Sequence, residues 1–247
     1  MRYLVISDIH ANLEALDAVL EAAAPLDHER LLVLGDLVGY GADPNAVVAR
    51  VRGLQPHAVI RGNHDKVGAG IESAEGFNAV ARSAIRWTYD TLTPEHRAWL
   101  ADLPEGPVVV DDLIEICHGT PFDEDAYVFD DLDALRSLQA SERPLCLFGH
   151  THVQIGYALS GDQFTLSTLD LARPLTFSVR NGSKHLLNPG SVGQPRDGDA
   201  RAAFALVDTE RRECTIHRID YPIAQAQARI LAEGLPEVLA QRLALGR

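Results

Sequence analysis

Lysine, cysteine and long hydrophobic runs are scarce in this chain of 247 residues, and each shortage excludes a class of protein. No run reaches the roughly 18 consecutive apolar residues of a membrane helix, so a membrane partner is not expected. The three cysteines, Cys117, Cys146 and Cys214, lie in or beside apolar runs, which predicts buried thiols in a reducing compartment. A short apolar run leads straight to Asp8 without a signal-peptide pattern, so we expect a cytoplasmic protein.

The charge balance is strongly acidic. The formal net charge is −13, and the only lysines are Lys66 and Lys184 among 22 cationic residues. Such a surface repels a nucleic-acid backbone, and no basic, aromatic groove for a long polymer is visible. We therefore expect a small phosphate-ester substrate rather than a nucleic acid polymer, while the oligomeric state stays open. An acidic chain that handles phosphate would use bound metal to offset the repulsion.

The first part of the chain alternates short apolar runs with amphipathic stretches. This alternation is typical of parallel strands joined by right-handed crossover helices. We expect strands at 3–7, 31–34 and 57–61, and helices at 13–24, 44–52, 77–92 and 94–103. The glycine-rich segment 66–76 is expected to be a mobile loop, and the helices within 77–103 could form a small cap beside the site.

The pattern changes in the rest of the chain. A hairpin is expected around Asp111 and Asp112, then a buried strand at 145–148, and after residue 153 mostly antiparallel strands. The acidic segment 122–133 is interpreted as an irregular, solvated face. Amphipathic helices are expected at 223–233 and 236–245. No linker divides the chain, so we expect a single domain over residues 1–247.

Side chains that bind metals follow five of the apolar runs. Each run ends in Asp, Asn or His, and five of the 10 histidines fall at these ends. Because α/β proteins place their chemistry at the carboxyl ends of strands, these side chains are candidates for one site. The set is Asp8, His10, Asp36, Asn63, His64, His118, His150 and His152.

The residue types indicate which ions fit. Imidazole with carboxylate favours Mn, Fe, Zn, Co or Ni over Ca, and no thiolate is placed for a cysteine-rich zinc site. In two-metal sites the ions lie about 3.5–4 Å apart, so a shared anionic ligand offsets their repulsion. Asp36, which follows the buried run 31–34, is the candidate for that ligand. Two divalent metal ions are the expected cofactors.

Five blocks of the sequence resemble those of the calcineurin-like metallophosphoesterase superfamily, in the same order. They are Asp8-Ile9-His10, Gly35-Asp36, Gly62-Asn63-His64-Asp65, His118 and Gly149-His150-Thr151-His152. The later Asn188-Pro189-Gly190-Ser191 is similar to a block of small bacterial phosphodiesterases of this kind. The resemblance implies an α/β fold, a four-layer αββα sandwich with two mixed β-sheets flanked by helices.

The resemblance also implies roles for these residues. One ion would be held by Asp8, His10, Asp36 and His152. The other would be held by Asp36, Asn63, His118 and His150. His64 would lie beside the metals, in contact with the phosphate or the leaving group, and Asp65 would orient it. The expected activity is hydrolysis of a small phosphodiester or nucleotide by a hydroxide that bridges the metals, with His64 protonating the departing alkoxide.

Two departures separate this chain from other branches of that superfamily. The protein-phosphatase and diadenosine-tetraphosphatase branches carry an Asp-Arg pair where this chain has Gly39-Tyr40, and a Glu where it has Asp65. Arg196 could replace the missing phosphate-binding arginine, or be an exposed loop residue. A dinucleoside polyphosphate hydrolase or a protein phosphatase is the alternative function. A non-catalytic binding scaffold would predict lost ligands, and none is missing.

Overall fold

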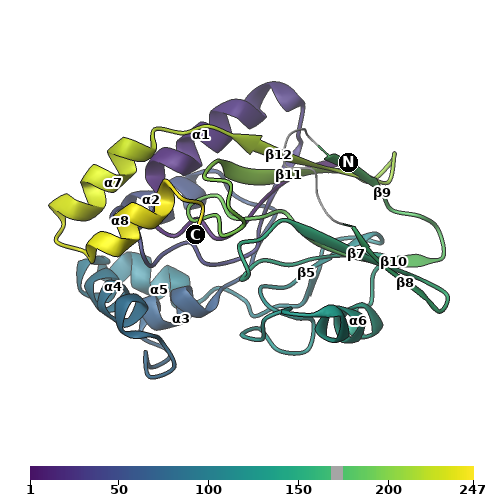
Figure 1. The fold of residues 1–247 in the computed structure, drawn as a ribbon, viewed down its shortest axis with the longest axis horizontal. Helices are drawn as coiled ribbons and strands as arrows, with labels where there is room; N and C mark the ends of the chain where they lie inside the picture. Colours follow the sequence, from purple (N-terminus) through teal and green to yellow (C-terminus); the bar gives the residue numbers. More distant parts are fainter. Residues whose placement is uncertain (168–174) are drawn as a thin grey trace.

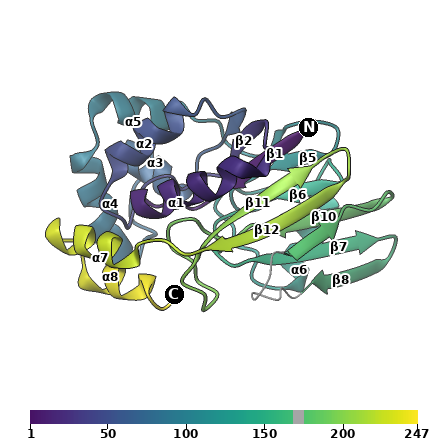
Figure 2. The same ribbon diagram turned by 90° about the horizontal axis from the view of Figure 1, so that it is seen from above.

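The computed structural model describes residues 1–167 and 175–247. Two six-stranded mixed sheets lie face to face in this part of the chain, with helices on their outer faces (Figures 1 and 2). This architecture confirms the predicted sandwich. None of the helices in the two described ranges is long and apolar enough to span a bilayer.

The first sheet combines the start and the end of the chain. Its order is β3 (Ala58–Val59), β2 (Arg30–Val33), β1 (Arg2–Ile6), β11 (Ala202–Asp208), β12 (Glu213–Ile219) and β9 (Leu175–Ser178). Strands β1, β2 and β3 pair in parallel, as the crossover pattern predicted, whereas β11 pairs antiparallel with β1. The carboxyl ends of the parallel strands therefore lie together at one edge.

The second sheet follows the same plan. Its order is β4 (Val108–Val109), β5 (Ile114–Ile116), β6 (Leu145–Leu147), β10 (Ser183–Asn188), β7 (Ile155–Ser160) and β8 (Gln163–Ser167). Strands β5, β6 and β10 pair in parallel, and the outer pairs are antiparallel. The expected hairpin is β4–β5, and its second strand leads directly to His118.

Alternating side chains in the strands divide the core into three layers. Val5 and Leu32 are fully buried between the sheets, whereas Leu4 and Val33 point to the helices outside the first sheet. Cys146 belongs to a third cluster, against the helix outside the second sheet. Strands that are apolar on both faces are typical of buried parallel pairing, which explains why these runs lack polar residues.

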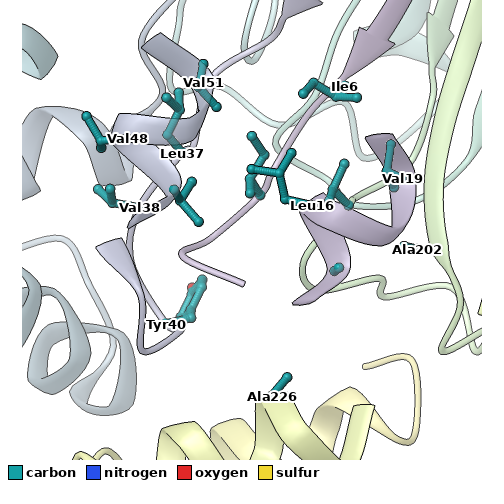
Figure 3. Close-up of a cluster of buried hydrophobic side chains, with 14 of the residues drawn as sticks. Ile6, Leu16, Val19, Leu37, Val38, Tyr40, Val48, Val51, Ala202 and Ala226 are labelled. Carbon is teal, nitrogen blue, oxygen red and sulfur yellow. The ribbon is translucent and has the colours of Figure 1, made fainter. Parts of the chain in front are cut away.

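Helices α1 (Leu13–Ala23), α2 (Pro44–Gly53), α7 (Ile223–Ala232) and α8 (Glu237–Leu243) contribute to the core on the first sheet. Figure 3 shows labelled residues of α1 (Leu16 and Val19) and of α2 (Val48 and Val51) with Leu37, and Ala226 of α7 at the edge of the cluster. Asn12 caps α1, because its side chain accepts a hydrogen bond from the Ala15 amide. Helix α1 contacts β11 and β12, whereas α7 packs on α1 and α8 packs on α7.

The structure differs from the predictions at two helices, α3 (Asn63–Ala69) and α6 (Asp131–Ala140), and contains the two helices that were expected within 77–103. Helix α3 occupies the first part of the expected loop 66–76, because Gly62 and Asp65 form its amino-terminal cap. Helix α6 begins within the acidic segment, where Asp130 caps it. Helices α4 (Ala79–Thr91) and α5 (Pro94–Ala101) contact α2 and α3, and their buried residues join the main core. Capping residues, rather than hydrophobic periodicity, determine where α3 and α6 begin.

Removing a side chain between the sheets should destabilise the fold. Leu147 on β6 is fully buried there, so Leu147→Ala should lower the free energy of unfolding by about 2–5 kcal/mol. Leu231→Ala on α7 is the control, because half of that side chain is exposed and its loss should change stability by about 0.5 kcal/mol or less. Urea denaturation measures both. Equal effects of the two substitutions would contradict the assigned layers.

Candidate metal centre

Sharp turns bring the predicted ligands to one edge of the sandwich. Five of them have left-handed backbone conformations: Asp8 (φ 53°), His10 (φ 49°), Asp36 (φ 53°), His150 (φ 66°) and His152 (φ 59°). This conformation is strained for residues other than glycine and concentrates at functional sites. The turns are held by main-chain bonds, such as those from the Asp8 amide to the Gly35 carbonyl and from His10 to Asp36.

Glycines give these side chains room. A Cβ atom at Gly62 would lie 2.2 Å from Oδ1 of Asp36, and one at Gly39 would lie 2.3 Å from Nδ1 of His64. No side chain fits at such distances. The glycines before Asn63 and Tyr40 therefore allow the close approach of backbone to ligand that the site requires.

The first group consists of Asp8, His10, Asp36 and His152, all buried and with ligand atoms within 4.8 Å of one another. Nδ1 of His10 lies 3.0 Å from the Val38 carbonyl oxygen, and Nδ1 of His152 lies 2.6 Å from that of Gln194. A carbonyl only accepts, so both Nδ1 atoms carry the proton and both Nε2 atoms keep a lone pair. These two Nε2 atoms lie 3.0 Å apart. Two lone pairs at this distance repel each other. A cation between the two Nε2 atoms would accept both lone pairs and remove this repulsion.

The second group consists of Asp36, His118 and His150. Nδ1 of His118 lies 2.8 Å from the Leu34 carbonyl oxygen, and Nε2 of His150 lies 3.0 Å from that of Asp125. By the same reasoning, Nε2 of His118 and Nδ1 of His150 are the free ligand atoms. Oδ1 of Asn63 is also buried without a hydrogen-bond partner.

Asp36 belongs to both groups, as predicted for a shared ligand. Its Oδ2 lies 3.5 Å from Nε2 of His10 and 3.5 Å from Nε2 of His118. Its Oδ1 accepts a hydrogen bond of 2.9 Å from the His64 amide. One oxygen is therefore fixed by the backbone of α3, and the other is aimed between the two sets of imidazoles.

Burial keeps most of these imidazoles neutral. It lowers the pKa of His10 and His152 well below the usual range, and it lowers the pKa of His150 to about 3. Burial also lowers the pKa of His118, but the charges of Asp36 and Asp8 outweigh it and raise the value to about 10. Burial raises the pKa of Asp8 to about 6 against the charge of His118. A bound cation would displace the His118 proton and favour the Asp8 carboxylate.

Orphaned polar atoms test whether metal ions fit. Oδ2 of Asp8, Oδ1 of Asn63 and Nε2 of His118 are buried and have no hydrogen-bond partner. Leaving such atoms unsatisfied costs about 1–3 kcal/mol each. All three are electron-pair donors or become so on losing a proton, and all three belong to the predicted ligand set. The residues therefore fit a pair of cations.

His64 lies beside both groups. Its ring packs against Tyr40 (4.4 Å between centroids), Phe77 (4.6 Å) and His10 (4.9 Å). Burial lowers its pKa to about 4. Its Nδ1 is buried without a partner, and the ring lines a cleft of about 280 Å³.

The predicted role of Asp65 is wrong. Its carboxylate does not contact the His64 ring, but accepts hydrogen bonds from the amides of Leu37 (2.8 Å), Val38 (3.2 Å) and Gly62 (3.0 Å). Side chains of neighbouring residues at a helix start point in different directions, so adjacency in sequence gave the wrong partner. Asp65 instead ties the loop after Asp36 to the start of α3.

Arg196 lies against the cluster. Its amide donates a hydrogen bond of 3.1 Å to the His152 carbonyl, and its guanidinium carbon is 5.6 Å from the centroid of the Tyr40 ring. Its charge lowers the pKa of both Tyr40 and Tyr127, although burial of each ring has the larger, opposite effect. Arg196 is therefore placed at the site between two tyrosines.

Sequence reasoning missed the residues that support the ligands. Tyr127 stacks on the His150 ring at 3.7 Å, and the Asp125 carbonyl fixes that ring, but both lie in the segment interpreted as a solvated face. The carbonyls of Leu34, Val38 and Gln194 act through the main chain, so side-chain identity carries no signal for them. The tyrosine among acidic residues was the one available signal.

The family comparison agrees with this geometry. The model of the calcineurin-like phosphoesterase superfamily domain matches residues 1–212. An uncharacterised protein of Methanocaldococcus jannaschii is 35% identical over 98% of this chain and 97% of its own length.

Solved structures show the same fold. A crystal structure of a metallophosphoesterase from Sphaerobacter thermophilus has a TM-score of 0.86 and 38% identity, with 100% of this chain and 99% of that chain covered. A hypothetical protein from Pyrococcus horikoshii has a TM-score of 0.78 and 22% identity, with 100% and 98% covered, and at that identity it supports the fold alone.

Metal content should reveal the shared position of Asp36. Wild-type protein loaded with Mn²⁺ should hold two ions per chain, His152→Ala should lose the ion of the first group, and Asp36→Asn should lose both, because only Asp36 belongs to both groups. Elemental analysis after desalting measures the ratio. His57→Ala, an exposed histidine outside the cluster, is the control. An Asp36→Asn protein that keeps two ions would refute the shared ligand.

Proposed function

The chain belongs to the calcineurin-like phosphoesterase superfamily, and on that premise we propose that it is a metal-dependent phosphodiesterase for small phosphodiester or nucleotide substrates. The observation that supports this most directly is the pair of buried Asp/His groups that share Asp36. Within this superfamily such a cluster is a site for phosphate-ester hydrolysis, and no residue of the predicted ligand set is missing from the chain.

We propose that Asp8, His10, Asp36 and His152 hold one ion, and that Asp36, Asn63, His118 and His150 hold the other. Imidazole and carboxylate ligands fit Mn, Fe, Zn, Co or Ni. When bound, the two ions supply a water molecule of lowered pKa and neutralise charge on the phosphate oxygens. The chain's part is to aim the ligand nitrogens, which the carbonyl partners of the four histidines do, while burial keeps the rings of His10, His150 and His152 neutral.

His64 is proposed to assist the leaving group. With a pKa of about 4 its ring is neutral at pH 7 and carries a single N–H. Nδ1 faces Gly39 in a buried position, which leaves Nε2 on the side of the cleft. The ring would then donate a hydrogen bond from Nε2 to the departing oxygen as negative charge develops there. This refines the predicted role, because an imidazole of that pKa rarely carries a second proton at neutral pH.

Arg196 is proposed to bind the phosphate. Gly39-Tyr40 replaces the Asp-Arg pair of the protein-phosphatase branch, and Tyr40 fills its position by packing on His10 and His64. Arg196 reaches the same place from another loop. A guanidinium can bind two phosphate oxygens at once, which fits it for this role.

We also propose a reducing compartment, the cytoplasm, as the location. Cys117, Cys146 and Cys214 are all buried and free, although the sulfur atoms of Cys117 and Cys146 lie only 3.6 Å apart. Buried cysteines without a structural disulfide are typical of proteins in a reducing compartment.

Chelation tests the proposed function directly. EDTA treatment should abolish hydrolysis of bis-p-nitrophenyl phosphate, and added Mn²⁺ should restore it, because the ions supply the nucleophile's activation. Asp36→Asn should lower kcat/KM by at least about 100-fold. Rates with p-nitrophenyl phosphate and diadenosine tetraphosphate separate a phosphodiesterase from a monoesterase and from a dinucleoside polyphosphate hydrolase. Full activity after thorough chelation would end this proposal.

The dependence of kcat on the leaving group tests the proposed role of His64. His64→Ala should reduce kcat more for a diester with an alkoxide leaving group than for one with p-nitrophenolate, because the better leaving group needs no hydrogen bond. The expected difference is about 10–100-fold, and His64→Gln, which keeps an N–H donor, should recover part of it. Metal content is the control for both variants. A uniform loss across all leaving groups would assign His64 a structural role instead.

A further inference from the structure

The cleft beside His64 lies between two segments without regular secondary structure. One wall comes from the segment between α3 and α4 and includes Glu72 and Phe77, and the other comes from the acidic segment and includes Asp125 and Tyr127. The His64 ring and two of the proposed metal ligands also line the cleft. An ester substituent that leaves the phosphate beside His64 would therefore enter this space.

Aromatic rings are concentrated in this cleft. Aromatic residues make up only 6% of the chain, yet Tyr40, Phe77 and Tyr127 all line it. The Phe77 ring packs against His64 at 4.6 Å between centroids and remains partly exposed. A partly exposed ring in a cleft offers a surface on which a planar group of a ligand can pack.

The wall that carries Phe77 is held in place from behind. NH2 of Arg82 on α4 donates hydrogen bonds to the main-chain oxygens of Glu75 (3.1 Å) and Phe77 (2.8 Å). Nζ of Lys66 on α3 pairs with Oε2 of Glu72 at 2.8 Å. Because these contacts exist before a ligand binds, little ordering of the wall is needed on binding.

The charges of the cleft do not suit a second anion. Among the residues that the structure describes, no arginine or lysine lines it, whereas the carboxylates of Glu72 and Asp125 do. Each carboxylate has one oxygen on Lys66, and in the described part of the chain Oε1 of Glu72 and Oδ1 of Asp125 have no hydrogen-bond partner. Such oxygens repel a phosphate and accept hydrogen bonds from hydroxyl or amino groups. The cleft therefore favours an uncharged substituent with hydrogen-bond donors.

We infer that this cleft binds a nucleoside, with the base on Phe77 and the ribose hydroxyls on the free oxygen of Glu72. This inference rests on the proposed function and narrows it, because the substrate class becomes phosphodiesters whose departing alcohol is a ribonucleoside. Acidic side chains bind ribose hydroxyls in dinucleotide-binding folds, and aromatic rings pack on bases. A cleft of about 280 Å³ suits one such group rather than a polymer.

Equilibrium binding tests the cleft without relying on activity. The first probe is the phosphonate analogue of AMP in which a methylene group replaces the O5′ atom, so that it is not hydrolysed. The second, methylphosphonate, lacks the nucleoside. Each is titrated by calorimetry into Mn²⁺-loaded protein at a fixed, saturating concentration of free Mn²⁺. Wild-type protein should bind the AMP analogue at least about tenfold more tightly than methylphosphonate.

Phe77→Leu keeps an apolar side chain beside His64 but removes the ring. It should weaken binding of the AMP analogue by about tenfold and that of methylphosphonate by less than about twofold, because only the packing of the base is lost. Phe122→Leu is the matched control and should change neither affinity, since that ring is 55% exposed and lies outside the cleft.

The ribose contact has a separate test. Glu72→Gln should weaken binding of the AMP analogue by about tenfold, and that of its 2′,3′-dideoxy counterpart by less than about twofold, because the second compound lacks the hydroxyl groups. Glu75→Gln removes the same charge from the same segment outside the cleft and should leave both affinities unchanged.

Two results would overturn the inference. One is equal affinity of wild-type protein for the AMP analogue and methylphosphonate. The other is equal weakening of both probes by Phe77→Leu, which would show that the ring acts only through His64. Metal-dependent hydrolysis of bis-p-nitrophenyl phosphate without a preference for the AMP analogue would reject the nucleoside cleft and leave the proposed function intact. The preference without any hydrolysis would support the cleft and reject the proposed function.

Discussion

Hydrogen bonds between histidine rings and main-chain carbonyls are the constraint on which the site depends. The four histidines of the cluster are each tied at one ring nitrogen to a carbonyl of another segment: Val38 for His10, Leu34 for His118, Asp125 for His150 and Gln194 for His152. Each bond fixes the tautomer and turns the second nitrogen, with its lone pair, toward the centre. The chemistry is thus determined by loops that contribute only backbone.

A strand places the Leu34 carbonyl, whereas those of Val38, Asp125 and Gln194 lie in loops. Leu34 directly follows β2, whose pairing with β1 also fixes Asp8 and Asp36 on neighbouring turns. The strained left-handed residues at these turns cost about 1–3 kcal/mol each, and they persist only where the surrounding structure fixes them. The two sheets, with their buried apolar layers, provide that stabilisation. The turns that carry the buried polar atoms of the site are bonded directly to the ends of the buried strands.

Much of this was predictable from sequence, for a physical reason. A buried parallel strand must be apolar, so a carboxylate or histidine immediately after it marks the edge where strands end, and Asp8, Asp36 and His118 follow this rule. Their grouping, including the position of Asp36 in both groups, appears in the structure. Contacts made through the main chain could not be predicted, since any residue has a carbonyl. The same limit explains why the partners of Asp65 were not predicted, because they are three main-chain amides. The start of α6 was missed because its cap, Asp130, lies within an acidic run.

One partly buried ion cluster connects these features. Lys66, on α3 and only 5% exposed, pairs with Glu72 (2.8 Å), Glu124 (3.0 Å) and Asp125 (2.6 Å). Helix α3 begins at Asn63, and the main chain of Asp125 holds His150, so Lys66 joins two parts of the second metal group. Pairing a buried charge stabilises little overall, because desolvation offsets the attraction, but breaking the cluster leaves the charge of buried Lys66 unpaired. The ion cluster therefore serves to position the chain. It fixes the segment 122–127 against α3, although composition alone predicts that this segment faces solvent. That fixed segment carries both the Asp125 carbonyl and the Tyr127 ring that hold His150 in place.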